Sequence, residues 1–353
     1  MKQGTKRLLY GLYLLIAVGV VAWIALRDPQ MQHLDQAIAQ VNLRWLFGVF
    51  GCMLVFWLLD AGVLHALFQY VQKKCTWLYS IKLALIGLFY GALTPCQSGS
   101  QPAQLVYMKR DGMSASVSTP LLASKFLLWQ IAEGAIATIT IPFCWNFVHA
   151  INPYLLIVLV IGYMINAAAI VAGVLVIWNQ NAVRKLSRFV VRIGLKVRIL
   201  KDQARWEQET EQFIQSYKSS IDLLFAHKKT AILSLALTFL EILTYFGVTY
   251  FIYLACTGHA FSLIRMLEII SIQSVLTMSV TFIPVPGATG ASEGGFYVYF
   301  ASVFPGSMMF IGMMLWRLAT YYMNLLAGVV MLIVDALTGK RKPLAPDSPP
   351  QEE

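Results

Sequence analysis

Five charged side chains inside long apolar stretches of this 353-residue sequence are candidates for a functional site: Lys125, Glu133, Glu241, Glu293 and Arg317. A charge at the centre of a lipid bilayer costs about 3 kcal/mol on insertion scales, so such a group usually faces an opposite charge or a wet cavity. We expect Glu293 and Arg317 to pair, because Glu293 lies in an interrupted stretch and Arg317 lies in the apolar run that follows it. Such a pair has two possible roles: it binds a ligand, or it is a structural ion pair that holds the interrupted stretch against the following apolar run.

Two of the other charges share one apolar run. Lys125 and Glu133 are eight residues apart, which is about two helical turns and places them on nearly one face. We predict that they line the same cavity; the alternative is that the long stem of Lys125 carries its ammonium group to the cytoplasmic interface. Asp60 lies within a further apolar run and is a candidate for burial inside the helical bundle.

Residues 290–294 match G-x-S-x-G, the pattern around the nucleophile of many serine hydrolases. That pattern needs a strand, a turn and a helix in succession and a histidine partner. Here apolar helical runs flank it, and His149 and His259 lie near the predicted outer face but far from it in the sequence, so a Ser–His pair is the less favoured interpretation. The sequence holds no HExxH, Walker or Rossmann pattern and no metal-ligand cluster, so we expect no metal, no cofactor and no ATP-driven pump.

The composition is that of a polytopic membrane protein. Hydrophobic residues make up 58% of the chain and charged residues 12%, whereas soluble domains carry about 25% charged residues. The net charge of +10 would suit a nucleic-acid partner. The charges gather at the ends of apolar runs, as the positive-inside rule expects, so we predict no nucleic-acid binding. The five cysteines form no CxxC pair and predict no disulfide framework.

Proline and glycine interrupt the apolar pattern at residues 281–296. Pro284 and Pro286 supply no backbone N–H, and each disfavours helix in the residue before it. Gly287 and Gly290 permit backbone angles that strain other residues. Broken backbone at membrane depth survives only where protein or water satisfies its polar groups, so this segment is predicted to be a site and not a linker.

A helix that enters at about Ile269 is therefore expected to break near Ile283 and to restart after residue 290. A second interruption, T-P-C-Q-S-G-S-Q-P-A-Q at 94–104, follows another apolar run. Interrupted apolar segments at corresponding places in two halves of a chain are the best sequence indication of a transporter binding site. Gly87 and Gly91, which precede the first interruption, form a GxxxG pair that permits close helix approach.

Hydropathy and the placement of Lys and Arg predict an all-α membrane protein with about six full transmembrane helices. These are expected at residues 8–26, 43–68, 116–147, 154–178, 230–256 and 307–337. Lys109 and Arg110 place both ends of segment 80–108 in the cytoplasm, which makes it a re-entrant hairpin, and the second interrupted segment enters from outside. Two re-entrant broken-helix hairpins from opposite faces form an inverted arrangement, as expected of an alternating-access or flipping protein. Both termini are predicted to be cytoplasmic.

The membrane domain is expected over residues 1–340, with a cytoplasmic segment at 179–229 and a disordered tail at 341–353. Four basic residues recur at every fourth position of the cytoplasmic segment: Arg184, Arg188, Arg192 and Lys196. This spacing favours a basic amphipathic helix against the anionic lipids of the inner leaflet. The alternative is a positive-inside loop with incidental periodicity.

Three motifs resemble one known family. Residues 284–296 read P-V-P-G-A-T-G-A-S-E-G-G-F and resemble the PGxxGxxE signature of the lysylphosphatidylglycerol synthase transmembrane region, the flippase-like part of the bacterial multiple peptide resistance factor. Residues 94–104 resemble its TPxxxGGQPxQ motif, with Ser100 in place of the second glycine. Residues 315–322, L-W-R-L-A-T-Y-Y, resemble its last span, which carries arginine and tyrosine. The resemblance covers about residues 5–340.

The resemblance implies a flippase-like transporter of the bacterial inner membrane that moves a phospholipid between leaflets and contributes to antimicrobial peptide resistance. The lipid would be lysyl-phosphatidylglycerol, another phospholipid or a polyprenyl-linked lipid, and a homo-oligomer or a partner synthase is a further expectation. Together with the intramembrane charges, the motifs imply a substrate cavity without catalytic or metal-binding residues. Its expected residues are Pro95, Gly99, Gln101, Pro102, Gln104, Lys125, Glu133, Glu241, Pro284, Pro286, Gly287, Gly290, Glu293, Arg317 and Tyr321.

Two other functions stay open at this stage. One is lysyl transfer to phosphatidylglycerol, or an accessory role to such an enzyme. In the full-length synthase a separate cytoplasmic domain performs that transfer, and the sequence up to Glu353 leaves no room for it, so we expect this chain not to be the enzyme. The other is a binding or scaffold subunit whose hairpins are structural, in which cavity mutations destabilise the protein without a specific transport defect.

Overall fold

Every regular element that the computed structural model describes is a helix. The described parts of the chain are residues 39–71, 75–144, 153–178 and 228–338, with single positions between 181 and 226. The predicted first span at 8–26, most of the cytoplasmic segment at 179–229 and the tail at 341–353 lie outside the described residues.

The helices follow one another with short connections. In chain order they are α3 (Leu43–Val71), α4 (Trp77–Ala92), α5 (Ser100–Arg110), α6 (Ala115–Thr140), the 3-10 turn η2 (Ile141–Cys144), α8 (Pro153–Trp178), α11 (Lys228–Thr257), α12 (Leu263–Val280), α13 (Ala291–Tyr299), α14 (Gly306–Arg317), the π-helical turn η3 (Leu318–Tyr322) and α15 (Met323–Thr338).

Five helical segments are long and apolar enough to cross a membrane. They are Leu43–Gln69, Val117–Cys144, Lys228–Thr257, Leu263–Val280 and Gly306–Thr338. Four of these coincide with predicted spans, and α8 is helical where a further span was predicted. The remaining segment is α12, which the sequence predicts as the first arm of the second hairpin and which also qualifies as a span by its length. The chain is thus an all-helical, multi-pass membrane protein.

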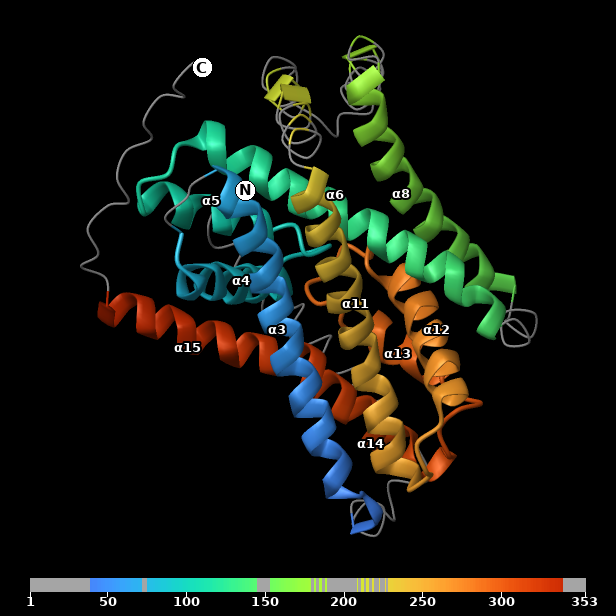
Figure 1. Ribbon diagram of the computed structural model, residues 1–353. Helices are drawn as coiled ribbons and strands as arrows, with labels where there is room; N and C mark the ends of the chain where they lie inside the picture. The colour runs from blue at the N-terminus through green and yellow to red at the C-terminus, as the bar shows by residue number, and fades with distance from the viewer. Residues whose placement is uncertain are drawn as a thin grey trace, which may run out of the picture.

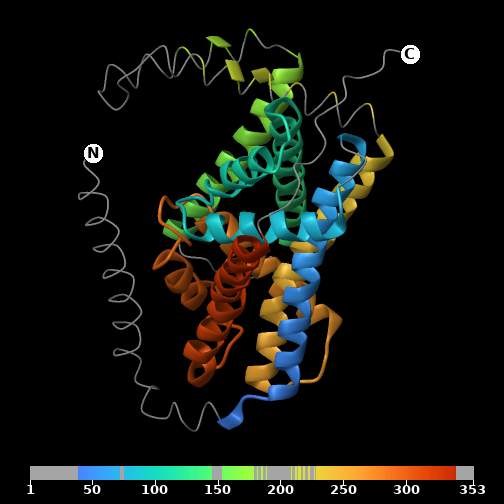
Figure 2. The ribbon, with the colours of Figure 1, turned by 90° about the vertical axis from the view of Figure 1, so that its left-hand side faces the viewer.

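Small residues let the helices approach closely. α3 and α11 lie side by side in both views (Figures 1 and 2), and a Cβ atom on Gly48 of α3 would overlap the ring of Phe251 on α11. α8 packs on α12 in the same way, because a Cβ atom on Gly162 would overlap the carbonyl group of Met278. These contacts hold α3, α11, α12 and α8 in one bundle, across which α15 passes beneath α4 (Figure 1).

The first interruption forms a tight helical hairpin. α4 begins at the N-cap Thr76, whose side chain accepts a hydrogen bond from Tyr79 N, and ends at Ala92. α5 then folds back against the Gly87 and Gly91 face of α4. A Cβ atom on Gly87 would overlap the side-chain amide of Gln104 on α5, which confirms that the GxxxG pair permits close approach.

Three details differ from the predicted helix limits. α12 begins at Leu263 and not at about residue 269, because the side chain of Ser262 caps it by accepting from Arg265 N. α6 ends at Thr140 and passes into a 3-10 turn, Ile141–Cys144, that contains Pro142, and the rest of the predicted span lies outside the described residues. The last helix is not regular, since a π-helical turn follows Arg317. Such turns are frequent at functional sites in α-helices.

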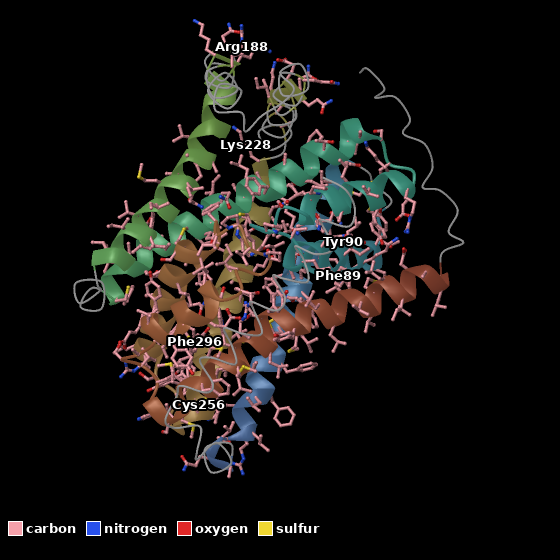
Figure 3. All side chains as sticks on the ribbon, turned by 180° about the vertical axis from the view of Figure 1, so that it is seen from behind. Phe89, Tyr90, Arg188, Lys228, Cys256 and Phe296 are labelled. Atoms are coloured by element: carbon pink, nitrogen blue, oxygen red, sulfur yellow. The ribbon has the colours of Figure 1, made fainter. Side chains whose placement is uncertain are left out.

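Basic side chains mark one end of the molecule. Figure 3 shows Arg188 and Lys228 at this end, Phe89 and Tyr90 near the middle and Cys256 toward the other end. Arg184, one of the four basic residues predicted to face lipid, donates hydrogen bonds of 2.8 Å to both carboxylate oxygens of Glu211. These hydrogen bonds lower the pKa of Glu211.

Candidate functional site

The two interrupted segments meet. Pro95 and Pro286 form an isolated antiparallel bridge, and the thiol of Cys96 lies 3.4 Å from the carbonyl oxygen of Phe282, to which it donates. Two motifs from distant parts of the sequence therefore build one site, at which the α4–α5 connection contacts the α12–α13 connection.

Both segments contain strained backbone. Cys96, Gln97 and Ala288 have positive φ angles of 51°, 54° and 46°, and Gly287 and Gly290 have φ of 60° and 87°. A non-glycine residue in such a conformation costs about 1–3 kcal/mol, and residues of this kind cluster at ligand-binding and switch regions. The strain at the meeting point supports its assignment as the functional site.

Thr94 holds the first segment in shape. Its hydroxyl donates to Tyr90 O at 2.8 Å and accepts from Gly99 N at 2.7 Å. A Cβ atom on Gly99 would lie 2.6 Å from the methyl carbon of Thr94 and 2.9 Å from Tyr90 O, so this position has no room for a side chain. The motif residues Thr94 and Gly99 thus fix the turn between α4 and α5.

Arg317 holds the second segment from the last helix. Its Nε lies 2.7 Å from Glu293 Oε1, so the predicted pair forms an ion pair with both side chains buried. Its terminal nitrogens donate to Gly287 O at 3.2 Å, and one of them donates to the Thr289 hydroxyl at 3.3 Å. The second oxygen of Glu293 accepts from Gly290 N at 2.6 Å and caps α13. Every nitrogen of this guanidinium group therefore already has an acceptor in the second segment.

The ring of Tyr321 packs against the second interrupted segment and against Arg317. The Arg317 guanidinium carbon lies 4.7 Å from the centre of the Tyr321 ring, and the backbone of Gly287 rests against that ring. Tyr321 belongs to the π-helical turn at 318–322, which directly follows Arg317 and which the hydropathy pattern does not reveal.

Gly287→Ala is expected to lower the free energy of unfolding by about 2–4 kcal/mol, because the new methyl group would overlap the Tyr321 ring at a left-handed backbone conformation. Gly294→Ala is the matched control: a Cβ atom there has no neighbour within 4 Å, and alanine favours helix over glycine by about 1 kcal/mol. Thermal unfolding in detergent, followed by size-exclusion chromatography, measures both. Equal transition temperatures for the two variants would contradict the tight contact at Gly287.

The other predicted site residues of the motifs are distributed around the hairpins. Gln104 is buried and donates to Leu83 O at 3.0 Å, which ties α5 to α4. Gln101 is half-buried and Pro102 is exposed, both in the first turn of α5, where proline is tolerated. Pro284 is exposed at the tip of the second segment.

Lys125 and Glu133 have different partners. The Lys125 ammonium group forms an ion pair with Asp60 on α3. The Glu133 carboxylate accepts from the indole of Trp129 at 3.0 Å. Asp60 is buried, as the sequence suggests, but its pairing with Lys125 could not be predicted, because spacing within one helix does not identify the facing helix.

A second ionic cluster joins the first hairpin to the end of α15. The buried ammonium group of Lys82 lies 2.8 Å from Asp111 and 2.7 Å from Asp335. Arg110 donates to both oxygens of Asp335 at 2.7 and 2.9 Å. Sequence reasoning missed this cluster, although Lys82 within an apolar run was a usable signal.

The G-x-S-x-G match has no hydrolase geometry in the described residues. Ser292 lies in the first turn of α13, which follows a helix and a turn and not a strand. His259 stacks on the Tyr253 ring and hydrogen-bonds its hydroxyl at 3.4 Å. The described part of the chain holds no group of three His, Cys, Asp or Glu side chains suited to a metal ion.

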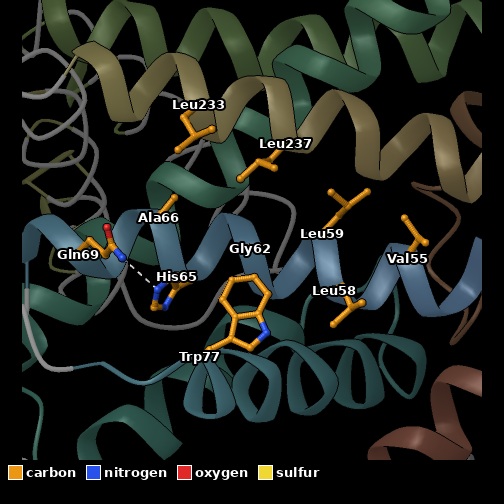
Figure 4. A pocket seen from close by; sticks show the side chains of 10 residues that line it. All are labelled: Val55, Leu58, Leu59, Gly62, His65, Ala66, Gln69, Trp77, Leu233 and Leu237. Atoms are coloured by element: carbon orange, nitrogen blue, oxygen red, sulfur yellow. Dashed lines mark hydrogen bonds between the residues drawn. The ribbon is translucent and has the colours of Figure 1, made fainter.

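An apolar groove of about 390 Å³ opens between α3, α11 and the start of α4. Figure 4 shows the indole of Trp77 facing α3 near Gly62, with Leu233 and Leu237 of α11 on the opposite side. His65 and Gln69 form a hydrogen-bonded pair of 3.0 Å at one end. The apolar lining of this groove suits a hydrocarbon chain.

Two comparisons place this architecture among known proteins. A family model described as the lysylphosphatidylglycerol synthase TM region matches residues 11–328. A "UPF0104 membrane protein" of Archaeoglobus fulgidus is 19% identical over 333 residues, which cover 93% of this chain and 97% of that protein.

Proposed function

The chain belongs to the lysylphosphatidylglycerol synthase TM region family, and we propose that it moves a phospholipid between the leaflets of a bacterial inner membrane. The observation that carries this proposal is the contact between two interrupted segments, Pro95 against Pro286, within a bundle of apolar helices. In membrane transporters the substrate site is typically formed by discontinuous helices near the middle of the bilayer.

The two hairpins are proposed to be re-entrant and inverted. α4 has 16 residues and α13 has 9, which correspond to about 24 Å and 14 Å, shorter than a hydrocarbon core of about 30 Å. Helices of this length bring their interrupted ends to the interior of the membrane when they enter from opposite faces. Lys109 and Arg110 at the end of α5 support a cytoplasmic entry for the first hairpin, with both chain termini in the cytoplasm.

The hydrogen bonds and ion pairs of the site residues indicate a different role for each of the two interrupted segments. Because the guanidinium donors of Arg317 are engaged by Glu293, Gly287 and Thr289, the pair sets the shape of the second segment, and direct headgroup binding by the pair requires that it open. Gln97 and Ser98 are exposed on the first segment. We assign headgroup contact to these polar side chains and to the strained backbone around them.

Lysyl-phosphatidylglycerol is the first substrate to test, since the name of the family refers to it. Its lysyl group carries positive charge, and backbone carbonyl oxygens of the interrupted segments are suitable partners. Its transfer to the outer leaflet would reduce the negative surface potential that attracts cationic peptides. This is the physical route by which the proposed activity would give resistance to antimicrobial peptides.

The test is leaflet-resolved lipid exposure in proteoliposomes that contain this protein alone. Fluorescent lysyl-phosphatidylglycerol and phosphatidylglycerol are offered in parallel, and a membrane-impermeant reductant quenches the outer leaflet. We expect faster exposure of at least one lipid than in protein-free vesicles. Folded protein without movement of either lipid would contradict the proposal, and formation of lysyl-lipid from charged tRNA by the same preparation would favour the enzyme alternative.

A further inference from the structure

Three ionisable side chains from three helices meet inside the bundle, separately from the interrupted segments. Asp60 of α3 and Glu241 of α11 are only 2% and 1% exposed. The ammonium group of Lys125 on α6 pairs with Asp60 Oδ1. The carboxyl group of Glu241 lies close enough to the Asp60 carboxyl group and the Lys125 ammonium group to interact with both. Among the described residues, the charged side chains that interact with Glu241 are Asp60 and Lys125.

A hydrogen bond between two carboxyl groups requires a proton on one of them, because ionised carboxylates only accept. Asp60 Oδ2 and Glu241 Oε2 are fully buried, and neither atom has a hydrogen-bond partner among the described residues. Two carboxylates and one ammonium group would leave a net negative charge in a medium where unpaired charge is costly. One added proton makes the cluster neutral and gives both orphaned oxygens a shared hydrogen.

We propose that Asp60 and Glu241 form a proton-binding site that holds one shared proton beside Lys125, and that loading and release of this proton are coupled to lipid movement. Proton binding stands on the geometry of the three side chains. The coupling rests on the proposed transport function.

A polar stripe on α11 connects this site to the basic end of the molecule. Thr230, Ser234 and Thr238 are buried and precede Glu241 at helical spacing, so they share its face. Thr230 Oγ1 and Ser234 Oγ have no hydrogen-bond partner in the described part of the chain, although buried hydroxyl groups normally have one. Water can satisfy such groups, and waters along this face would carry protons between the carboxyl pair and the end of α11 at Lys228 (Figure 3).

Glu241→Gln is the informative substitution, because a glutamine amide can donate to Asp60 Oδ2 and imitate the protonated glutamate without leaving a buried charge. Infrared difference spectra are recorded against pH on purified protein in lipid. The background carries Glu133→Gln, which removes another buried carboxyl group. We expect a protonated-carboxyl band that disappears at alkaline pH and that Glu241→Gln abolishes. Glu268→Gln, which changes a surface pair with Arg265, should leave the band unchanged.

A band that persists unchanged in Glu241→Gln, or the absence of any such band, would overturn the proton site whether or not the protein moves lipid. Asp60→Asn gives the same test if Glu241→Gln does not fold. In vesicles with an imposed pH gradient, lipid movement by the wild type should depend on the gradient, and movement by Glu241→Gln should not. If the infrared band titrates with pH but lipid movement by the wild type does not depend on the pH gradient, the coupling is wrong and the proton site stands.

Discussion

Glu293→Gln is expected to reduce lipid movement at least about tenfold while the protein still inserts into the membrane. Glutamine keeps an oxygen that can accept from Gly290 N, but it loses the charge that holds the Nε of Arg317. Removing one partner of a buried ion pair costs about 3–5 kcal/mol. If about 1.4 kcal/mol of this cost raises the activation barrier for transport, the rate already falls tenfold. The leaflet-resolved vesicle assay measures the rate.

The control for this variant is Glu268→Gln on α12, which makes the same chemical change in a pair with Arg265 whose side chains are 35% and 42% exposed. An exposed pair contributes about 0–1 kcal/mol, so the control should transport like the wild type. Arg317→Lys keeps the charge but loses the planar fork that reaches Gly287 and Thr289, and should be intermediate. If folded Glu293→Gln protein moves lipid at the wild-type rate, the shape that this pair gives the second segment is not needed for transport.

The sequence predicts those features of the site that depend on local chemistry. Proline and glycine end α4 after Ala92 and α12 after Val280 because neither residue type continues a helix well, and these interruptions are confirmed. Glu293 and Arg317 were expected to pair because an unpaired charge in the membrane interior is costly and these two residues lie in successive segments. The ion pair between them is confirmed, whereas its role in transport stays a prediction.

Contacts between distant helices could not be predicted in the same way. A helical period identifies which residues share a face, but not which other helix that face contacts. The pairing of Lys125 with Asp60, the cluster of Lys82 with Asp335, and the bridge between the two interrupted segments all depend on tertiary packing. The π-helical turn after Arg317 also escaped prediction, because one extra residue in a helical turn leaves no trace in an apolar run.

The contact between the interrupted segments gives the second large effect. If lipid passes between the hairpins, Pro95 and Pro286 must separate during each transport cycle. Directly opposed residues of an antiparallel pair have Cα atoms about 4.5–5.5 Å apart, which is within the range that a disulfide spans. Pro95→Cys with Pro286→Cys, in a background carrying Cys96→Ser, is therefore expected to cross-link on oxidation and to stop lipid movement.

Reduction should restore movement in the same vesicles, which separates the effect of the cross-link from the loss of two prolines. Each single-cysteine variant treated with the oxidant controls for modification of the thiol itself. The double variant tests motion and not merely proximity, because proximity is required for cross-linking and separation is required for activity. Complete cross-linking with undiminished lipid movement would mean that the two segments stay together throughout the cycle. The lipid would then travel along the outside of the paired hairpins, where the apolar groove between α3, α4 and α11 offers a surface for its acyl chains.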